Sequence, residues 1–425
     1  MGKNRKNAAA LLALIFLLLL PCSLLFGQRS TSSMHGRLGD DLILKIALIG
    51  PGDELYFWWG HIGLVIEDRL TGQARFYDWG VFSFENENFF LNFAFGRLNY
   101  SCAVSYADSN YDIYISTNRD ITLYTLDLPP EKKEAILYQA ENNVLPENRD
   151  YSYHHFKDNC ATRIRDVLDM ALDGQLSEEF KKTPGRFNLR QHIRRHTWAH
   201  PFFDWLLNFW MSKDIEKPIS VWDEMFLPSE IALRIDDFRY IDPNGASRLL
   251  VSSVDTINTS TGRPAVLKAP KSLWPGALLV SLIFSEILLI LYLLWGKKKS
   301  FRSLLGTTSI FLGLFFGIAG SMLLFLMFFT DHDYTYHNIN IFFVNPLFLS
   351  LVPLGFILAF SNSEKKRFVA SRLIRYFWLI TLLGSLLVMA LKFNPAFVQE
   401  NQTTLALVMP LAAVMIFIVS RLKKI

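Results

Sequence analysis

The hydrophobic positions divide the chain into two regions with different patterns. Up to about residue 270, short apolar runs alternate with polar and charged segments, as they do in a globular domain. Beyond it, long apolar runs cover residues 273–295, 303–329, 341–360, 373–391 and 403–420. Each of these runs is long enough to cross the hydrocarbon core of a bilayer as a helix. The pattern therefore predicts a folded domain followed by an all-α bundle of about five transmembrane helices.

A further apolar run lies close to the N-terminus, at residues 8–26, and basic residues precede it. A charged start followed by an apolar segment is typical of a signal peptide, and equally of an uncleaved N-terminal anchor. We therefore divide the chain into a leader or anchor (1–27), a soluble domain (28–270) and a five-helix transmembrane domain (271–425).

Charged residues predict the orientation of the bundle. Lysine and arginine gather at 297–302, 365–375 and 421–424, whereas the loops at 330–340 and 392–402 hold a single lysine between them. Because basic loops stay in the cytoplasm, the domain before the bundle lies outside, as the basic N-terminus also predicts. The net charge is only +4 and the basic residues form no patch in the soluble domain. We therefore expect a membrane and no nucleic acid among the partners.

Apolar alternation and turn residues predict an α+β soluble domain. The segments His61–Ile66 and Ala74–Trp79 flank a polar turn and should form a β-hairpin. Further strands are expected at Leu44–Ile49, Asp112–Ser116 and Ile121–Leu128, and a helix is expected from Pro130 to Asn143. The aromatic segment 199–211 fits either the membrane interface or a core helix of the soluble domain. Residues 243–271 have the composition of a linker.

A second helix is predicted directly after Asp158 and Asn159, because an apolar stripe with helical spacing follows them and Gly174 marks a stop. Either residue is a natural N-cap, so Cys160 falls in the first turn. The free amides and the positive end of the helix dipole favour a thiolate at this position.

Only three cysteines are present, and they do not suggest a disulfide framework. Cys22 lies in the first apolar run, and Cys102 fits a small buried hydrophobic residue. A nucleophilic Cys160 needs a base and a group that orients the base. His61 opens a predicted strand, and Asp78 lies on the partner strand of the same hairpin.

A strand-borne histidine facing a cysteine at a helix N-terminus is the geometry of papain-like thiol enzymes. Here the histidine precedes the cysteine, so the fold would be a circularly permuted papain-like (NlpC-type) α+β domain. The alternative for His61 is an ordinary surface or core histidine. His154 and His155 are closer to Cys160 in sequence, but closeness along the chain does not bring side chains together.

Several motifs resemble the Lnb-type family of bacterial envelope proteins. They include the segments Gly60-His61, Tyr77-Asp78-Trp79-Gly80, Phe95-Gly96, Tyr100, 146–149, Tyr151 with Tyr153, 158–166, 225–228, 330–333, 338–340 and 345–347. The resemblance covers most of the chain, and the stretch from Asp158 to Asp166 is its most specific part. Trp79 departs from the phenylalanine expected there, but both residues are aromatic.

The resemblance implies an apolipoprotein N-acyltransferase of the bacterial inner membrane, with the soluble domain facing the periplasm. Such an enzyme moves a fatty acyl chain from a phospholipid to the α-amino group of a diacylglyceryl-cysteine lipoprotein. A similarity to permuted papain-like acyltransferases of the lecithin–retinol type also implies acyl transfer through a thioester. Cys160 would be the nucleophile, His61 the base and Asp78 the orienting group, with no cofactor.

Five further residues are candidates for substrate binding. Arg163 and Arg165 suit phosphate oxygens, although ion pairs with nearby carboxylates are an equally ordinary role for them. Asn159 fits an N-cap as well as a substrate contact. His332 and Asn338 lie in a loop on the same side of the membrane as the thiol, and we expect them to meet a lipid headgroup or the soluble domain and not a metal.

Two rival functions use the same residues. A membrane-anchored thiol hydrolase, such as a murein amidase, an endopeptidase or a phospholipase, would use the Cys160–His61 pair with water as the acceptor. A non-enzymatic envelope assembly factor would keep the pair without using it. Glu286 adds a carboxylate in the middle of the first span, which fits either a functional group or a hydrogen bond between helices.

Overall fold

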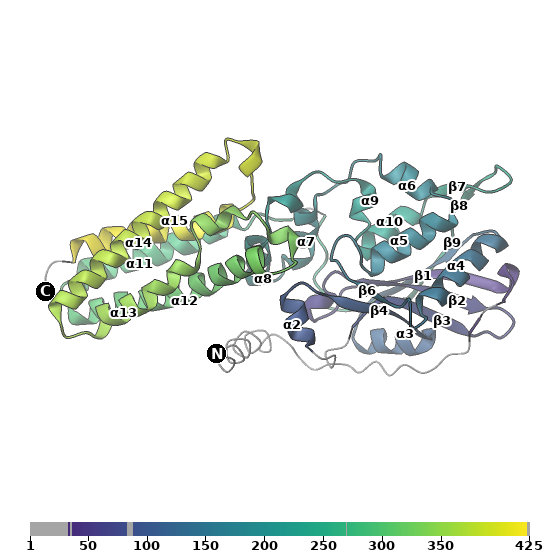
Figure 1. Cartoon of the computed structure of the whole chain (residues 1–425), viewed down its shortest axis with the longest axis horizontal. Coiled ribbons are helices and arrows are strands. Elements are labelled where there is room, and N and C mark those ends of the chain that lie inside the picture. The colour runs from purple at the N-terminus through teal and green to yellow at the C-terminus, as the bar shows by residue number, and fades with distance from the viewer. Residues whose placement is uncertain (1–32, 35, 83–87, 269, 423–425) are drawn as a thin grey trace. The chain divides into compact units, whose positions relative to one another are not determined.

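The computed structural model describes residues 33–34, 36–82, 88–268 and 270–422, and it divides the chain into two compact units (Figure 1). The first unit contains the described residues up to Leu189 together with Pro218–Val266. The second contains Arg190–Lys217 and the residues from Leu267 onward. The predicted leader or anchor at 1–27 lies outside the described residues.

The first unit is built on an antiparallel sheet with the strand order β6-β4-β3-β2-β1-β5-β9. Its strands are β1 (Leu42–Ile49), β2 (His61–Asp68), β3 (Ala74–Val81), β4 (Asn99–Tyr106), β5 (Ile121–Leu126), β6 (Asp150–Ser152) and β9 (Val251–Asn258). The predicted hairpin is confirmed as β2–β3, with Leu64 opposite Tyr77. A separate two-stranded sheet joins β7 (Arg239–Ile241) to β8 (Ser247–Leu249).

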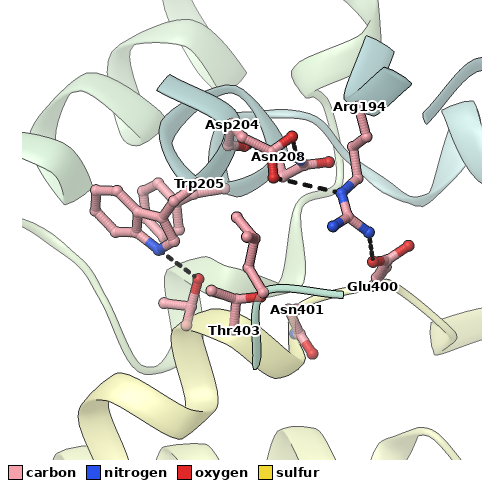
Figure 2. A pocket seen from close by; sticks show the side chains of 10 residues that line it. Arg194, Asp204, Trp205, Asn208, Glu400, Asn401 and Thr403 are labelled. Atoms are coloured by element: carbon pink, nitrogen blue, oxygen red, sulfur yellow. Dashed lines mark hydrogen bonds and ion pairs between the residues drawn. The ribbon is translucent and has the colours of Figure 1, made fainter. Parts of the chain in front are cut away.

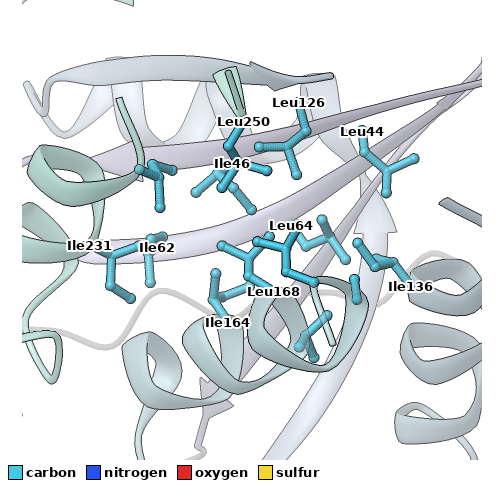
Figure 3. Close-up of a cluster of buried hydrophobic side chains, with 14 of the residues drawn as sticks. Leu44, Ile46, Ile62, Leu64, Leu126, Ile136, Ile164, Leu168, Ile231 and Leu250 are labelled. Carbon is cyan, nitrogen blue, oxygen red and sulfur yellow. The ribbon is translucent and has the colours of Figure 1, made fainter. Parts of the chain in front are cut away.

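Side-chain alternation along the strands gives the sheet two buried faces. One face packs against α4 (Pro130–Asn143), α5 (Cys160–Ala171) and α10 (Pro228–Ile235), and Figure 3 shows the aliphatic side chains between these layers. The other face packs against α3 (Ala107–Ser116) through a smaller cluster that includes Val65. Three short helices complete the unit: α2 (Phe89–Ala94), α6 (Gln175–Phe180) and α9 (Val221–Glu224).

Two segments of the first unit differ from the sequence prediction. The expected strand at Asp112–Ser116 is the second half of helix α3, because Ala107, Asn110 and Tyr114 fall on one helical face and are buried. The expected linker contains β8 and β9, and β9 forms the sheet edge. Most side chains of β9 are exposed, so the strand is held mainly by its backbone pairing with β5.

The second unit contains the long apolar helices α11 (Trp274–Trp295), α12 (Lys299–Phe329), α13 (Leu351–Phe360), α14 (Glu364–Leu391) and α15 (Gln402–Arg421). Five segments of the described chain are long and apolar enough to cross a membrane, and α13 belongs to the third, Ile339–Phe360. The predicted architecture, an α+β domain followed by about five candidate spans, is therefore confirmed. Glu286 is exposed on α11 and does not lie buried between helices.

Two helices that precede the spans in sequence also belong largely to the second unit. They are α7 (Leu189–Thr197) and α8 (Pro201–Trp210). Trp205 and Phe209 of α8 are buried in the same hydrophobic cluster as residues of α12 and α15. The aromatic segment 199–211 is therefore part of the membrane unit and not a core helix of the soluble domain.

Candidate active site

Cys160 is the first residue of α5, and the cap in front of it is fully formed. The Asn159 side chain accepts a hydrogen bond from the Thr162 amide at 2.9 Å, and the Asn159 amide donates to the Thr162 hydroxyl at 2.7 Å. The Asn159 side chain also donates to the carbonyls of His155 and Phe226, at 2.8 and 3.0 Å. The predicted N-cap is thus confirmed, and this capping box fixes the backbone from which the thiol projects.

The predicted base and its orienting group meet at one end of the β2–β3 hairpin. His61 is the first residue of β2, and its Nε2 donates a hydrogen bond of 2.7 Å to Oδ1 of Asp78 on β3. Both side chains are 16% exposed, so little water competes for this bond. Cys160 lies close enough to the imidazole to influence its pKa, so the three predicted catalytic side chains lie together.

This arrangement keeps the imidazole positively charged. Burial on its own lowers the pKa of His61, but the charges of Asp78 and Cys160 and hydrogen bonds to both outweigh burial and raise the pKa to about 10. An imidazolium beside a cysteine sulfur is the proton donor that a thiol nucleophile needs when its leaving group departs.

A glycine bulge lies beside the thiol. The β3–β4 register shifts between Trp79 and Val81, and the intervening Gly80 has a φ of 96°, which a side chain would strain. A Cβ at Gly80 would lie 3.6 Å from the Cys160 Cβ, so the sheet backbone passes directly beside the predicted nucleophile.

Two tyrosines on or next to β6 converge on the same place, and neither was predicted from the sequence to have a catalytic role. A Cβ at Gly80 would also lie 3.8 Å from the Tyr153 ring and 3.9 Å from the Tyr151 hydroxyl. That hydroxyl is buried and has no hydrogen-bond partner within the described residues. Burial, and then the charge of Cys160, raise the pKa of Tyr151 well above its ordinary value, so the hydroxyl keeps its proton. Their spacing two residues apart in a strand was the available signal, since it places both side chains on one face.

Cys102 does not take part in this site as a disulfide partner, since both described cysteines are free. Cys102 lies on β4, opposite Trp79 of β3, and is buried in the hydrophobic core. Burial raises the pKa of its thiol, which keeps the sulfur neutral. The prediction of a small buried hydrophobic residue is confirmed.

Both arginines of α5 already have partners. Arg163 forms a double hydrogen bond with Asp158, at 2.5 and 2.7 Å, and its guanidinium lies 4.3 Å from the centre of the Tyr151 ring. Arg165 pairs with Asp166 at 2.8 Å and covers the ring of Trp222. Both guanidinium groups therefore bind carboxylates and aromatic rings of the protein itself. A contact of either group with phosphate stays a prediction.

The two candidates from the membrane unit lie in the loop after α12. Asn338 is buried, and its amide donates to the carbonyls of Phe209 and Trp210 while its oxygen accepts from Gln399. All of these bonds tie the loop to α8 and to the α14–α15 connection. His332 is partly exposed and precedes a short 3₁₀ turn. A substrate contact for either residue stays a prediction.

The membrane unit also contains a buried polar cluster, drawn in Figure 2. Arg194 donates to Glu400 at 2.8 Å and to Asp204 at 3.4 Å, and Thr197 donates to Asp204 at 2.6 Å. Burial raises the pKa of Asp204, against the opposing effect of Thr197 and Arg194. A small cavity lies beside these groups, and no cysteine or histidine lines it. It therefore offers no thiol–imidazole pair, and Cys160 remains the candidate catalytic centre.

Comparisons with known proteins agree with this division of the chain. Residues 40–195 match the family model described as the Lnb N-terminal periplasmic domain, and residues 269–424 match the Lnb transmembrane domain. No curated protein and no solved structure matches the chain.

Proposed function

Given that the chain belongs to the Lnb family, with a periplasmic domain and a transmembrane domain, we propose that it is an apolipoprotein N-acyltransferase of the bacterial inner membrane. The observation that carries the proposal is the meeting of Cys160, His61 and Asp78 in a chain with five candidate membrane spans. The first feature supplies a thiol nucleophile with an oriented base, and the second brings the nucleophile to a lipid substrate.

In the first half-reaction, the Cys160 sulfur attacks the carbonyl carbon of a phospholipid ester. The C–S bond forms, the ester C–O bond breaks, and the His61 imidazolium gives its proton to the leaving glycerol oxygen. The Thr162 amide is taken by the Asn159 cap, and the amides before it in the first turn of α5 have no partner within the helix and would stabilise the oxyanion. The Tyr151 hydroxyl is a further donor on this side of the sulfur.

In the second half-reaction, the α-amino group of the diacylglyceryl-cysteine attacks the thioester carbonyl. The now neutral His61 accepts the amine proton, the C–N bond forms and the C–S bond breaks. The products are the N-acylated lipoprotein and the regenerated thiolate–imidazolium pair. Cys160 is only 9% exposed, which restricts water at the thioester and favours transfer to an amine over hydrolysis.

Mass spectrometry of lipoprotein N-termini tests the proposal. When this chain is expressed in a host that lacks its own N-acyltransferase, we expect lipoproteins to gain one amide-linked acyl chain. The thiol-hydrolase function predicts free α-amino groups together with an accumulation of lysophospholipid, free fatty acid or cleaved murein. Unchanged lipoproteins with no new product would contradict both enzymatic functions.

Asp78→Asn should shift the alkaline limit of activity toward lower pH. The Asp78 charge is the largest influence raising the pKa of His61 to about 10, so its removal lets burial lower that pKa. The protonated form of His61 is then lost at lower pH, and we expect the limit to move by about one pH unit or more. The measurement is the rate of Cys160 acylation between about pH 6 and about pH 11, a range that spans that pKa. An unchanged alkaline limit would show that Asp78 does not govern the imidazole.

A further inference from the structure

Helix α2 is a short apolar helix at the surface of the first unit. Its residues Phe89–Ala94 contain no charged side chain, and none of them is buried. Leu91 is 48% exposed, and the phenylalanines around it are partly exposed. Such a surface is unusual on a soluble domain, where apolar side chains of this size normally face the core.

A row of aromatic rings connects α2 with the nucleophile. Phe89 of α2 stacks on Phe82 with a centroid distance of 5.6 Å, and Phe82 stacks on Tyr100 at 5.0 Å. Tyr100 then contacts Tyr153 at 4.3 Å. A Cβ placed on Gly80 would lie 3.8 Å from the Tyr153 ring and 3.6 Å from the Cys160 Cβ, so the last ring of this series is next to Cys160. We call these four rings, Phe89, Phe82, Tyr100 and Tyr153, the aromatic row.

We propose that α2 and the aromatic row form the surface that holds the acyl chain of the donor phospholipid while its ester reaches Cys160. This inference rests on the proposed function. The occupant follows from continuity: the row begins at the exposed helix, passes through the buried ring of Tyr100 and ends beside Cys160, whose sulfur would carry the acyl group. An acyl chain bonded to that sulfur needs an apolar surface of this kind along its first methylenes.

Charge and setting also favour a lipid as the occupant. Arg97 follows α2 and lies 5.6 Å from the centre of the Phe95 ring, so an exposed guanidinium borders the apolar helix. Aromatic rings beside a basic side chain are typical of protein surfaces at the headgroup layer of a membrane. The same chain contains five candidate membrane spans, which keep the domain close to a bilayer.

Two matched variants of the full chain in phosphatidylethanolamine–phosphatidylglycerol vesicles test the surface. Leu91→Asp places a carboxylate on α2, whereas Leu70→Asp places one on the β2–β3 turn, where the native leucine is 66% exposed. Leu91→Asp should slow Cys160 acylation by palmitoyl phospholipid about tenfold, because a carboxylate in an apolar lipid environment is costly. It should slow acylation by a water-soluble butyryl ester far less than acylation by palmitoyl phospholipid, and Leu70→Asp should affect neither reaction.

A photo-crosslink gives a second readout that does not depend on activity. Benzoylphenylalanine at position 91 should form adducts with phospholipid, and the same group at position 70 should not. If Leu91→Asp reacts like Leu70→Asp with both donors, or if position 91 crosslinks only to protein or to nothing, the surface is not a lipid site. If Leu91→Asp slows both donors equally, the crosslink alone decides. If the unmodified chain accepts neither donor, the proposed function fails, and the crosslink still reports on α2.

Discussion

Cys160→Ala is expected to abolish lipoprotein N-acylation, lowering the rate by about 10³-fold or more. The alanine variant has no atom that can form the thioester, so both half-reactions stop. The capping box that fixes the start of α5 uses Asn159 and Thr162 and not the sulfur, so the helix should keep its position. The measurement is the N-terminal acylation of a reporter lipoprotein, together with hydroxylamine-sensitive labelling of the enzyme by a phospholipid donor.

Cys102→Ala is the matched control for this variant. Its sulfur is buried in the core, and burial keeps the thiol neutral, so we expect labelling and acylation to remain within about twofold of the unmodified chain. Should the Cys160→Ala chain fold and still acylate lipoproteins, the nucleophile must be sought elsewhere. Labelling that persists in Cys160→Ala and disappears in Cys102→Ala would move the thioester to β4.

His61→Ala is expected to lower the acylation rate by about 10²- to 10⁴-fold, the range for losing a positioned acid–base group. Both half-reactions are affected, because the same imidazole protonates the leaving glycerol oxygen and later accepts the amine proton. The variant also leaves the Asp78 carboxylate without its 2.7 Å partner. Single-turnover labelling of Cys160 by a phospholipid donor measures the first step, and release of the label to a lipoprotein measures the second.

His155→Ala provides the comparison for His61→Ala. His155 is much nearer to Cys160 in sequence but is exposed, and its ring contacts Tyr153 edge-on at 5.7 Å. We expect activity within about twofold of the unmodified chain, since surface changes away from buried networks have small effects. The reverse result, with His155→Ala inactive and His61→Ala active, would assign the base to the loop before α5.

The parts of this structure that could be predicted from the sequence are those with strong local signals. The cap before Cys160 is one, because an asparagine followed by an apolar stripe specifies where a helix begins. The β2–β3 hairpin is another, since apolar alternation and a polar turn fix both strands and bring His61 near Asp78. The long apolar runs gave the candidate spans for the same reason.

Segments whose structure depends on distant partners were missed. In α3 the order Tyr-Asp-Ile-Tyr-Ile alternates like a strand, but Tyr114 packs against strands of the sheet only as a helical residue. Strand β9 has serines and threonines typical of a linker, and only the free edge of β5 makes it a strand. Propensity is a weak guide where tertiary pairing decides.

The same reason explains the limits of the site prediction. The roles of Arg163 and Asn338 depend on neighbours that come from other elements, such as the Tyr151 ring and the carbonyls of α8. The aromatic row shows this most clearly, because its rings come from four separate segments and no spacing in the sequence relates them. The proposed nucleophile and base could be predicted because each lies at a recognisable boundary of an element.

The division of the chain at Leu189, Lys217 and Val266 affects how the protein withstands proteolysis and truncation, and the order in which its units fold. The polypeptide passes between the two units three times, so one proteolytic cut in a connection leaves them tied by the remaining passages. A secreted fragment ending near residue 268 would carry Trp205 and Phe209 without the helices that cover them, and would tend to aggregate. The sheet of the first unit is completed only by β9, which follows α7 and α8 along the chain. During synthesis the first unit therefore cannot finish its sheet until two helices of the membrane unit have already been made.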